Sequence, residues 1–313
     1  MKKEGLVILS TGSWYDVLTD DGIVKCRLRG KFRIKGIKTT NPVVVGDRVV
    51  IEQKNENETP FIIEISERKN YIIRKSTNLS KVSHIIASNI DIAFLVITLR
   101  SPRTSSGFID RFLTAAEAYR IPVHLVFNKI DIYNEDEKLE IKKIALLYEK
   151  IGYTCYYTSV VEDIGIQELR EVVKDKTVLF SGHSGVGKSA LINSIDENLD
   201  IRVGDISEVH DKGKHTTTFA QIHLLSFGGF VVDSPGIKEF GLIDYNKDEI
   251  SHFFLEMRKY LNKCRFNNCT HTHEPGCIVK KAVENGEINI QRYNNYLAII
   301  NDEDMNLESW QLD

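Results

Sequence analysis

The sequence predicts a multidomain chain in which a small all-β domain, a central α/β domain and a small α-helical domain follow one another. Up to about residue 70, short apolar alternations are broken by glycine and aspartate, and no stretch has a helical period. From residue 90 onward, short apolar runs alternate with helical patterns, which is typical of a parallel sheet with crossover helices. After residue 241 the pattern changes to a charged amphipathic helix, a group of cysteines and a further helix from about residue 278. We therefore expect domains at residues 1–70, 71–242 and 243–313.

The composition is that of a globular protein of a reducing compartment. Of 313 residues, 42% are hydrophobic and 27% are charged, so the chain is too apolar to be disordered and too long for one average domain. The net charge is −3, so any affinity for nucleic acid must come from a local basic patch. The most apolar stretch, at residues 85–99, is too short and too polar to span a bilayer. The N-terminus does not resemble a secretion signal, and we expect a cytoplasmic protein.

One strand of the first domain is predicted to be strongly basic. Residues 22–46 contain no acidic side chain. Cations occupy every second position, at Lys25, Arg27, Arg29, Lys31, Arg33 and Lys35. Because successive side chains of a strand point to opposite faces, one face would pack on the core while the other displays the cations. Such a stripe favours an RNA backbone as ligand, although a solvated strand face is the alternative, and Trp14, Tyr15 and Phe32 would add base stacking unless they belong to the core.

The central domain is predicted to contain five strands and four helices. We expect the strands at residues 90–99, 123–127, 154–157, 178–181 and 230–232. We expect the helices at residues 109–120, 136–151, 166–173 and 188–195. Since α/β sheets bind ligands at the carboxyl ends of their strands, the residues that follow these strands are the candidates for a site.

A phosphate-binding loop, or P-loop, follows the fourth strand. The segment matches G-x-x-x-x-G-K-[ST] and opens into a helix, which is the context that the motif requires. Its glycines would let backbone N–H groups surround a β-phosphate at the N-terminus of the helix. Lys188 would neutralise the β- and γ-phosphates, and Ser189 would ligate Mg²⁺ through its hydroxyl. The nucleotide-binding residues predicted here are Gly182, His183, Ser184, Gly185, Val186, Gly187, Lys188, Ser189 and Ala190.

A second motif predicts which base is bound. Asn128, Lys129, Ile130 and Asp131 form an N-K-x-D string directly after the strand at residues 123–127. A carboxylate there can accept from the N1–H and the exocyclic amine of guanine, whereas adenine has an acceptor at N1, so Asp131 indicates GTP as the substrate. Asn128 would tie this string to the P-loop, and Lys129 would pack its stem along the base. Ser159, after the next strand, would complete the base pocket.

Two further segments would hold the metal and the γ-phosphate. Asp233 ends the strand at residues 230–232 and would hold Mg²⁺ through water, while Gly236 would offer its N–H to the γ-phosphate. Residues 214–218, KHTTT, offer hydroxyls that would reach the metal only when the γ-phosphate is present. We interpret this stretch as a switch segment, although threonines in an exposed loop are usually ordinary loop residues.

The order of these motifs predicts a circular permutation. In ordinary GTPases the P-loop comes first and N-K-x-D follows, whereas here N-K-x-D at residue 128 precedes the P-loop at residue 182. The same pocket forms only if the chain is circularly permuted, which is tolerated where the original termini lie close together. The chain then leaves the GTPase core soon after residue 237 and leads directly into the third domain.

The third domain carries a metal-binding pattern. Cys264, Cys269 and Cys277 fall within fourteen residues, and histidines stand at 271 and 273. Three thiolates and one imidazole complete a closed tetrahedral Zn²⁺ site, which predicts one structural zinc ion. Both His271 and His273 are candidates for the fourth ligand.

The chain resembles the ribosome small-subunit-dependent GTPase A family, bacterial circularly permuted GTPases of 30S subunit assembly, over essentially its full length. The resemblance rests on residues 128–131, 182–189, 213–218 and 233–236 and on the cysteine cluster. It implies an N-terminal OB-fold, a permuted P-loop GTPase core, a C-terminal zinc-binding domain, hydrolysis stimulated by the 30S subunit and a role in its late maturation. It also implies that His271 is the fourth zinc ligand and that Thr217 is the switch threonine on Mg²⁺.

The resemblance points to an unusual catalytic residue. Ile237 stands where GTPases that position water have glutamine, and an aliphatic side chain cannot orient a nucleophile, so intrinsic hydrolysis should be slow. The resemblance implies His215 as the substitute, since an imidazole in a loop could orient water once a partner holds the loop in place. A solvated loop histidine is the alternative for this residue.

These inferences predict a GTPase that binds the 30S subunit and its 16S rRNA and is monomeric when free. One alternative is an RNA-binding assembly factor that uses GTP only as an occupancy switch. Another is a permuted GTPase that acts on the large subunit or on another RNA. Phosphate release with and without 30S subunits tests the first alternative, and co-sedimentation with separated particles tests the second.

Overall fold

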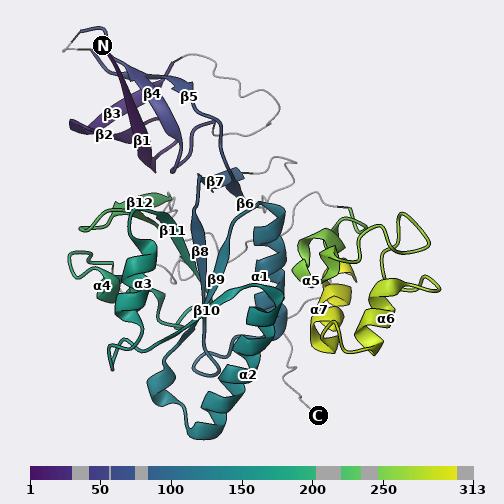
Figure 1. Ribbon diagram of the computed structural model, residues 1–313. Helices are drawn as coiled ribbons and strands as arrows, with labels where there is room; N and C mark the ends of the chain where they lie inside the picture. Colours follow the sequence, from purple (N-terminus) through teal and green to yellow (C-terminus); the bar gives the residue numbers. More distant parts are fainter. Residues whose placement is uncertain (30–41, 56–57, 75–83, 202–219, 234–245, 302–313) are drawn as a thin grey trace, which may run out of the picture.

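The computed structural model contains a barrel, a central sheet flanked by helices and a helical C-terminal unit (Figure 1). It describes residues 1–29, 42–55, 58–74, 84–201, 220–233 and 246–301. One sheet runs in the order β10-β9-β8-β11-β13-β12-β1-β2-β3-β5-β4, and its last five strands close into a barrel because β1 also pairs with β4. The predicted multidomain architecture is therefore confirmed.

The barrel has the five strands of an OB-like fold. They are β1 (Lys2–Ser10), β2 (Tyr15–Thr19), β3 (Gly22–Leu28), β4 (Arg48–Glu52) and β5 (Phe61–Ile65). Neighbouring strands are antiparallel except β3 and β5, which are parallel. The alternating apolar positions of the sequence form its core, where Val7, Val17, Cys26 and Ile62 are fully buried. Tyr15 is 1% exposed and belongs to this core rather than to a stacking surface.

The central sheet has the α/β arrangement that the sequence predicts. Its parallel strands are β8 (Ile92–Ile97), β9 (Val123–Asn128), β10 (Thr154–Thr158), β11 (Thr177–Ser181) and β13 (Phe230–Asp233), and β12 (Gln221–Leu224) is antiparallel to β13. The helices are α1 (Ser106–Ala118), α2 (Glu135–Ile151), α3 (Ile166–Val173) and α4 (Lys188–Ile195). The first two helices share one apolar core with the sheet, and the last two share another, so each pair covers one face. All five predicted strands and all four predicted helices are confirmed.

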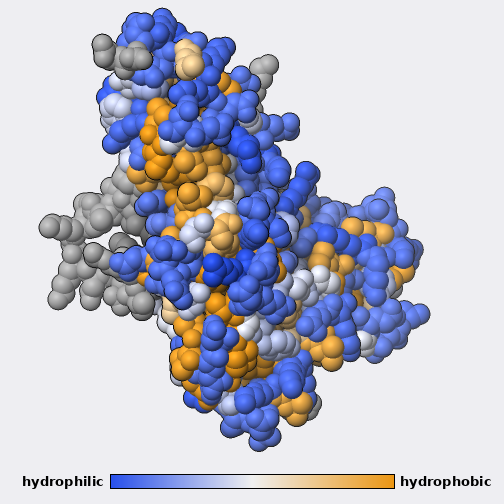
Figure 2. Space-filling view, turned by 60° about the vertical axis from the view of Figure 1, so that its left-hand side comes forward, coloured by the Kyte–Doolittle hydropathy of each residue, from blue (hydrophilic) through white to orange (hydrophobic). Residues whose placement is uncertain are grey.

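Three strands were not predicted. The hairpin of β6 (Tyr71–Arg74) and β7 (His84–Ser88) connects the barrel to the central sheet. The third is β12, which joins the barrel strands to the central strands because its Gln221 pairs with Leu9 of β1. Figure 2 shows the side of the molecule on which β12 lies, with a band of hydrophobic residues running from the barrel onto the central domain.

A buried polar network fixes the barrel to the amino end of the central sheet. The Asp47 carboxylate is fully buried and accepts hydrogen bonds from Arg68 Nε at 2.6 Å, from Ser88 Oγ at 2.6 Å and from the Val44 amide at 2.9 Å. The Asn70 side chain donates from Nδ2 to the Ile90 carbonyl oxygen and accepts at Oδ1 from the Ile90 amide. Since a buried charge is tolerated only when it is paired and hydrogen-bonded, these contacts define one orientation of the barrel.

The C-terminal unit packs against α1. It contains η3 (Ile250–Phe253), α5 (Leu255–Arg258), α6 (Ile278–Glu284) and α7 (Ile290–Asn301). The prediction of one charged amphipathic helix after residue 241 is wrong for the described part, because Phe254 is extended, at φ −99° and ψ 109°, and separates η3 from α5. Its side chain is fully buried against the Tyr296 ring, and this packing outweighs the helical pattern. No helix in the described ranges is long and apolar enough to cross a membrane.

Candidate functional site

The P-loop lies between the carboxyl end of β11 and the N-terminus of α4. Gly182 and Gly187 have φ values of 141° and 100°, and a Cβ would lie 2.4 Å from the Val96 carbonyl oxygen at the first and 2.5 Å from Asn128 Nδ2 at the second. Only glycine fits both positions, because the conformation and the close approach each exclude a side chain. Gly187 is also the N-cap of α4, so no side chain caps this helix. The N-terminus of α4 therefore carries the positive end of the helix dipole without a capping side chain, as in helices that bind anions.

Lys188 is held inside the loop. Its Nζ donates to the carbonyl oxygens of Gly182 at 2.9 Å and His183 at 2.8 Å, and the residue is 6% exposed. Ser189 is 8% exposed at the next position, and Ser184 and Gly185 form the exposed tip of the loop. The loop therefore holds one positive charge among its carbonyl oxygens, in the position from which a P-loop lysine neutralises phosphate charge.

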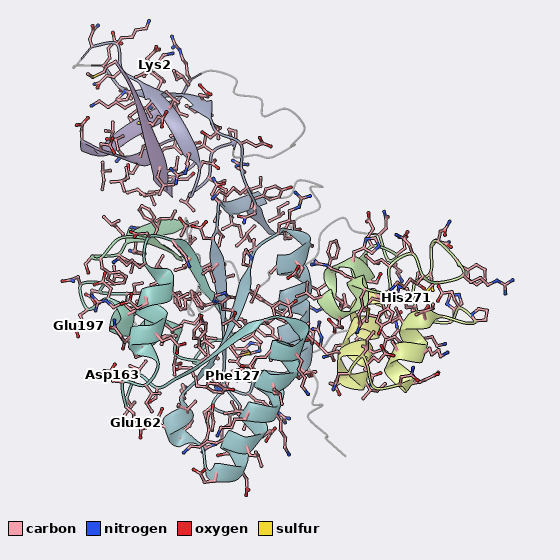
Figure 3. The ribbon with its side chains drawn as sticks, in the orientation of Figure 1. Lys2, Phe127, Glu162, Asp163, Glu197 and His271 are labelled. Carbon is pink, nitrogen blue, oxygen red and sulfur yellow. The ribbon has the colours of Figure 1, made fainter. Side chains whose placement is uncertain are left out.

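The N-K-x-D segment contacts the P-loop directly. Asn128, at the end of β9, is 2% exposed, and its Nδ2 donates to the Val186 carbonyl oxygen at 2.9 Å. Lys129 has φ 61°, and its Nζ donates to the carbonyl oxygens of Gly185 and Ser101, both at 2.7 Å. Phe127, labelled in Figure 3, lies one residue before Asn128 on β9. Two segments more than fifty residues apart in the chain thus meet at the carboxyl ends of β9 and β11, the two strands that flank β8 in the sheet.

The base-recognition candidates also meet. Asp131 lies in η1 (Ile130–Ile132), and its carboxylate accepts from Ser159 Oγ at 2.6 Å. Ile130 is half-buried and packs on the core beneath this turn, so it holds the turn rather than facing solvent. The Ser159 backbone pairs with Ile164 in both directions, which closes the loop that follows β10. Asp131 is half-buried, so its carboxylate combines a fixed orientation with access for a ligand.

The structure also identifies a residue that the sequence reasoning did not single out. Thr158, fully buried at the end of β10, donates from Oγ1 to Asn128 Oδ1 at 2.9 Å. This bond determines which end of the Asn128 amide points at the P-loop. A threonine at the end of a strand carries no sequence signal for this role, because the contact spans thirty residues of chain.

The predicted residues for Mg²⁺ and the γ-phosphate, apart from Lys188 and Ser189, lie wholly or partly outside the described residues. The Asp233 backbone ends β13, directly beside the strand that carries the P-loop, but its side chain is outside the described set. His215, Thr217 and Gly236 also lie outside the described residues. The described part of the candidate site therefore comprises the P-loop, the N-K-x-D segment and Ser159.

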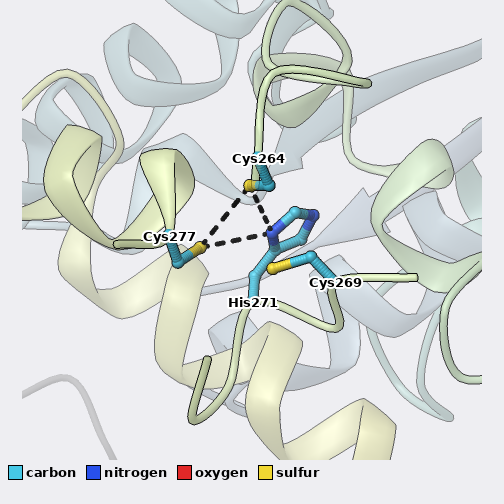
Figure 4. A group of neighbouring side chains, drawn as sticks. All are labelled: Cys264, Cys269, His271 and Cys277. Atoms are coloured by element: carbon cyan, nitrogen blue, oxygen red, sulfur yellow. Dashed lines mark hydrogen bonds between the residues drawn. The ribbon is translucent and has the colours of Figure 1, made fainter. Parts of the chain in front are cut away.

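The four metal-ligand candidates of the C-terminal unit converge (Figure 4). The ligand atoms of Cys264, Cys269, His271 and Cys277 all lie within 4.8 Å of one another. His271 Nδ1 is 3.3 Å from Cys277 Sγ and 3.6 Å from Cys264 Sγ, and the two sulfur atoms are 3.9 Å apart. A tetrahedral Zn²⁺ with its usual bond lengths requires edges of about 3.5–3.8 Å, so the donor set fits this ion. His273 is exposed, and its Nδ1 contacts the Thr272 hydroxyl at 2.9 Å.

The surroundings of the cluster hold its loop in place. Tyr293 donates to the His271 carbonyl oxygen at 2.7 Å, and Tyr296 donates to the Thr270 carbonyl oxygen at 2.6 Å, so α7 fixes the backbone that carries the imidazole ligand. Burial would raise the pKa of Glu274, but hydrogen bonds from Thr270 and its neighbours outweigh it and lower that pKa to about 2. Burial raises the pKa of the Cys269 thiol to about 12. The metal-free thiol is therefore protonated at neutral pH, and binding of a cation must displace its proton.

The basic strand of the barrel has the predicted alternation in its described part. Lys25, Arg27 and Arg29 are exposed, whereas Cys26 between the first two is fully buried. Lys25 and Arg27 lie over the half-buried Trp14 ring, with 5.8 Å from Nζ and 4.3 Å from Cζ to the ring centroid. Arg29 forms an ion pair with Glu52 at 2.6 Å. Three predicted positions, Lys31, Arg33 and Lys35, lie outside the described ranges, as does Phe32.

Comparison with known proteins covers almost the whole chain. A family model described as RsgA GTPase matches residues 65–243, and one described as RsgA N-terminal domain matches residues 4–60. A small ribosomal subunit biogenesis GTPase RsgA of Bacteroides fragilis is 51% identical, over 96% of this chain and 97% of that protein. A protein of the same name from Flavobacterium psychrophilum is 50% identical, over 96% of this chain and 93% of that protein.

Solved structures agree in fold. The crystal structure of YjeQ from Thermotoga maritima has a TM-score of 0.78 and 34% identity, over 96% of this chain and 98% of that one. The structure of YloQ, a circularly permuted GTPase, has a TM-score of 0.73 and 29% identity, over 96% and 95%. On the family models, the relatives and the assembled motifs together, this chain is a GTPase and belongs to the RsgA family.

Proposed function

We propose that this GTPase acts in the biogenesis of the small ribosomal subunit, that the subunit stimulates its hydrolysis of GTP, and that it works late in subunit maturation. The observation that carries the proposal is the hydrogen bond from Asn128 to Val186, which joins the base and phosphate segments despite their reversed order in the chain. The relatives named above support the choice of the small subunit as partner.

The proposed roles follow the contacts in the site. The P-loop would bind the phosphates, with Lys188 neutralising charge from its position among the loop carbonyls. Asp131 would pair with the guanine edge and Ser159 would orient its carboxylate. Ser189, Thr217 and Asp233 would hold Mg²⁺, which neutralises the β- and γ-phosphates when GTP is bound. Gly236 would bond the γ-phosphate, and one structural Zn²⁺ would be held by the Cys₃His cluster.

We further propose the organisation that accompanies this function. Residues 1–70 would form the RNA-binding OB-fold, residues 71–242 the permuted GTPase core and residues 243–313 the zinc-binding domain. The protein would be monomeric when free and would act in the cytoplasm, where the subunit and its 16S rRNA are found. Support comes from the order of the described elements, because η3 of the C-terminal unit is the first of them after β13.

Titration of GTP hydrolysis with purified small subunits tests this function. We expect slow release of phosphate from GTP alone and a rate that rises with subunit concentration to saturation. Large subunits and ATP are the matched controls, and neither should support this rise. An unchanged rate with small subunits would instead indicate an occupancy switch, and equal stimulation by large subunits would indicate a different ribosomal particle.

Replacement of His215 by alanine should abolish the stimulated rate while GTP binding persists. The reason is that Ile237 cannot orient water, so the imidazole of His215 would supply this function once the subunit holds its loop. We expect a loss of about 10²-fold or more in stimulated turnover. The control is His252→Ala, which removes an exposed histidine of η3. Full stimulation in the His215 variant would mean that another group orients the attacking water.

Replacement of both Lys25 and Arg27 by alanine should weaken binding to small subunits and reduce its dependence on salt. Each cation that contacts a phosphate releases counterions, so the slope of log K against log[salt] should fall by about 0.7–0.9 per residue. The charge-matched control removes Lys138 and Lys142 from α2. Co-sedimentation at several salt concentrations measures both slopes. Equal slopes for the two double variants would mean that the basic strand does not contact RNA.

A further inference from the structure

Helix α1 packs against the C-terminal unit (Figure 1) and, near its N-terminus, also contacts the P-loop through the Phe108 ring. From this arrangement we propose that Phe108 is a positioning residue for the P-loop, and that the C-terminal unit holds it in place through the buried Asp110–Arg292 ion pair. The inference rests on the proposed function in one respect, namely that residues 182–189 bind the phosphates of GTP.

The first contact is an aromatic pair. The Phe108 ring and the His183 ring have centroids 4.0 Å apart and planes inclined by 32°. His183 is the second residue of the P-loop, and its carbonyl oxygen accepts from Lys188 Nζ at 2.8 Å. Burial, together with the nearby Lys188 charge, lowers the pKa of His183, so the imidazole is neutral at pH 7 and packs as an aromatic ring. Phe108 thus supports the backbone that holds the phosphate-binding lysine.

The second contact is a buried ionic network. Arg292 of α7 donates from Nη1 to Asp110 Oδ1 at 2.5 Å, and both side chains are at least 98% buried. Asp110 also accepts from Asn295 Nδ2 at 2.6 Å and from Tyr148 OH at 2.8 Å. Arg292 also donates to the Glu256 carboxylate, from Nε at 2.7 Å and from Nη2 at 2.9 Å. Every charge in the network has a partner, and removing one partner leaves another charge buried without compensation.

The two contacts are mechanically linked because they share one turn of helix. Phe108 and Asp110 are two residues apart, which places them about 200° apart around the axis, on opposite sides of α1. A shift of α7 that moves Asp110 therefore also moves Phe108 against the P-loop. Such a link would let contacts made by the C-terminal unit alter GTP binding without touching the nucleotide.

The same interface contains a natural control. Glu117, near the other end of α1, pairs with Arg258 of α5 at 2.6 Å, and the Arg258 side chain is 42% exposed. This pair joins the same two units, but it lies nine residues from Phe108, or about 13 Å along the helix. Loss of the pair should loosen the interface without displacing Phe108.

The first experiment measures the aromatic contact. We expect Phe108→Ala to raise the KM for GTP by about 3- to 10-fold with a smaller change in kcat, and Phe108→Tyr to restore the wild-type KM. Combined with His183→Ala, Phe108→Ala should cost less than the product of the two single effects, because the rings act through each other. Multiplicative effects, or an unchanged KM in Phe108→Ala, would overturn the inference. If Lys188→Ala also bound GTP normally, the proposed site itself would be wrong.

The second experiment tests whether the Asp110–Arg292 ion pair holds Phe108 in place. We expect Arg292→Met to raise the KM for GTP by about 2- to 30-fold and Arg258→Met to leave it within about twofold of wild type. Asn295→Ala removes a single bond to Asp110 and decides the question if Arg292→Met does not fold; it should raise KM in the same direction. Equal KM values for the Arg258 and Arg292 variants, or an unchanged KM in folded Asn295→Ala, would show that the C-terminal unit does not position Phe108.

Discussion

Replacing Asp131 by asparagine should convert this GTPase into an enzyme that prefers xanthosine triphosphate. The Asp131 carboxylate can accept from both donors on the guanine edge, whereas an asparagine amide presents a donor to the exocyclic amine. Xanthine has a carbonyl oxygen at that position, so the amide can pair with it and still accept from N1–H. With GTP, one charge-assisted bond is lost, the other becomes a neutral bond and two donors are left facing each other, which should lower kcat/KM by about 10²-fold or more. The values of kcat/KM for GTP and for xanthosine triphosphate, measured with the wild type and with Asp131→Asn, test this change of preference.

The control for this substitution lies in the same region. Asp163→Asn removes an exposed carboxylate from the loop after β10, which is labelled in Figure 3, and should leave the preference for GTP unchanged. The Ser159 hydroxyl can still donate to the remaining oxygen of the asparagine, so the local structure should persist. If Asp131→Asn reduced hydrolysis of both nucleotides equally, Asp131 would be a structural residue and the base would bind elsewhere.

Replacement of Cys277 by serine should remove zinc and unfold the C-terminal unit. Serine retains the N-cap position that Cys277 occupies at the start of α6, so the substitution tests the metal rather than the helix. Because metal binding supplies much of the folding free energy of small zinc domains, we expect a loss of about 5 kcal/mol or more for this unit. Zinc content by mass spectrometry and thermal unfolding with and without a chelator provide the measurements.

His273→Ala is the matched control for the metal. This histidine is exposed and lies outside the cluster, two residues beyond His271, so its loss should change neither the zinc content nor the unfolding temperature. One equivalent of zinc retained in Cys277→Ser, or a chelator that leaves unfolding unchanged, would contradict a structural metal at this site.

Local patterns were sufficient for the elements that have a strong period or a motif. The helix at residues 166–173 and the one that begins at Lys188 have the bounds that the sequence predicts. The P-loop glycines could be predicted because a phosphate loop needs backbone freedom at fixed spacings, and the structure shows why at Gly182 and Gly187. The cysteine spacing likewise predicted which side chains come together.

Other features depend on contacts between residues that are far apart in the chain. Phe254 interrupts a helical pattern because its ring packs beside Tyr296, a residue more than forty positions away. Phe108 occurs in an ordinary amphipathic helix, and its contact with His183 depends on how α1 crosses the sheet. Asp110 and Arg292 would each be expected on the surface, and only the assembled interface shows that they are buried together. Contacts of this kind leave no signal in a local stretch of sequence.

The most direct test of the central claim is the structure of this protein with Mg²⁺ and a non-hydrolysable GTP analogue. The claim is that two segments in reversed chain order form one nucleotide site. We expect the triphosphate to lie over residues 182–189, in contact with Lys188, and the guanine to pair with Asp131. A nucleotide bound away from either segment, or an adenine nucleotide bound equally well in the same place, would contradict it.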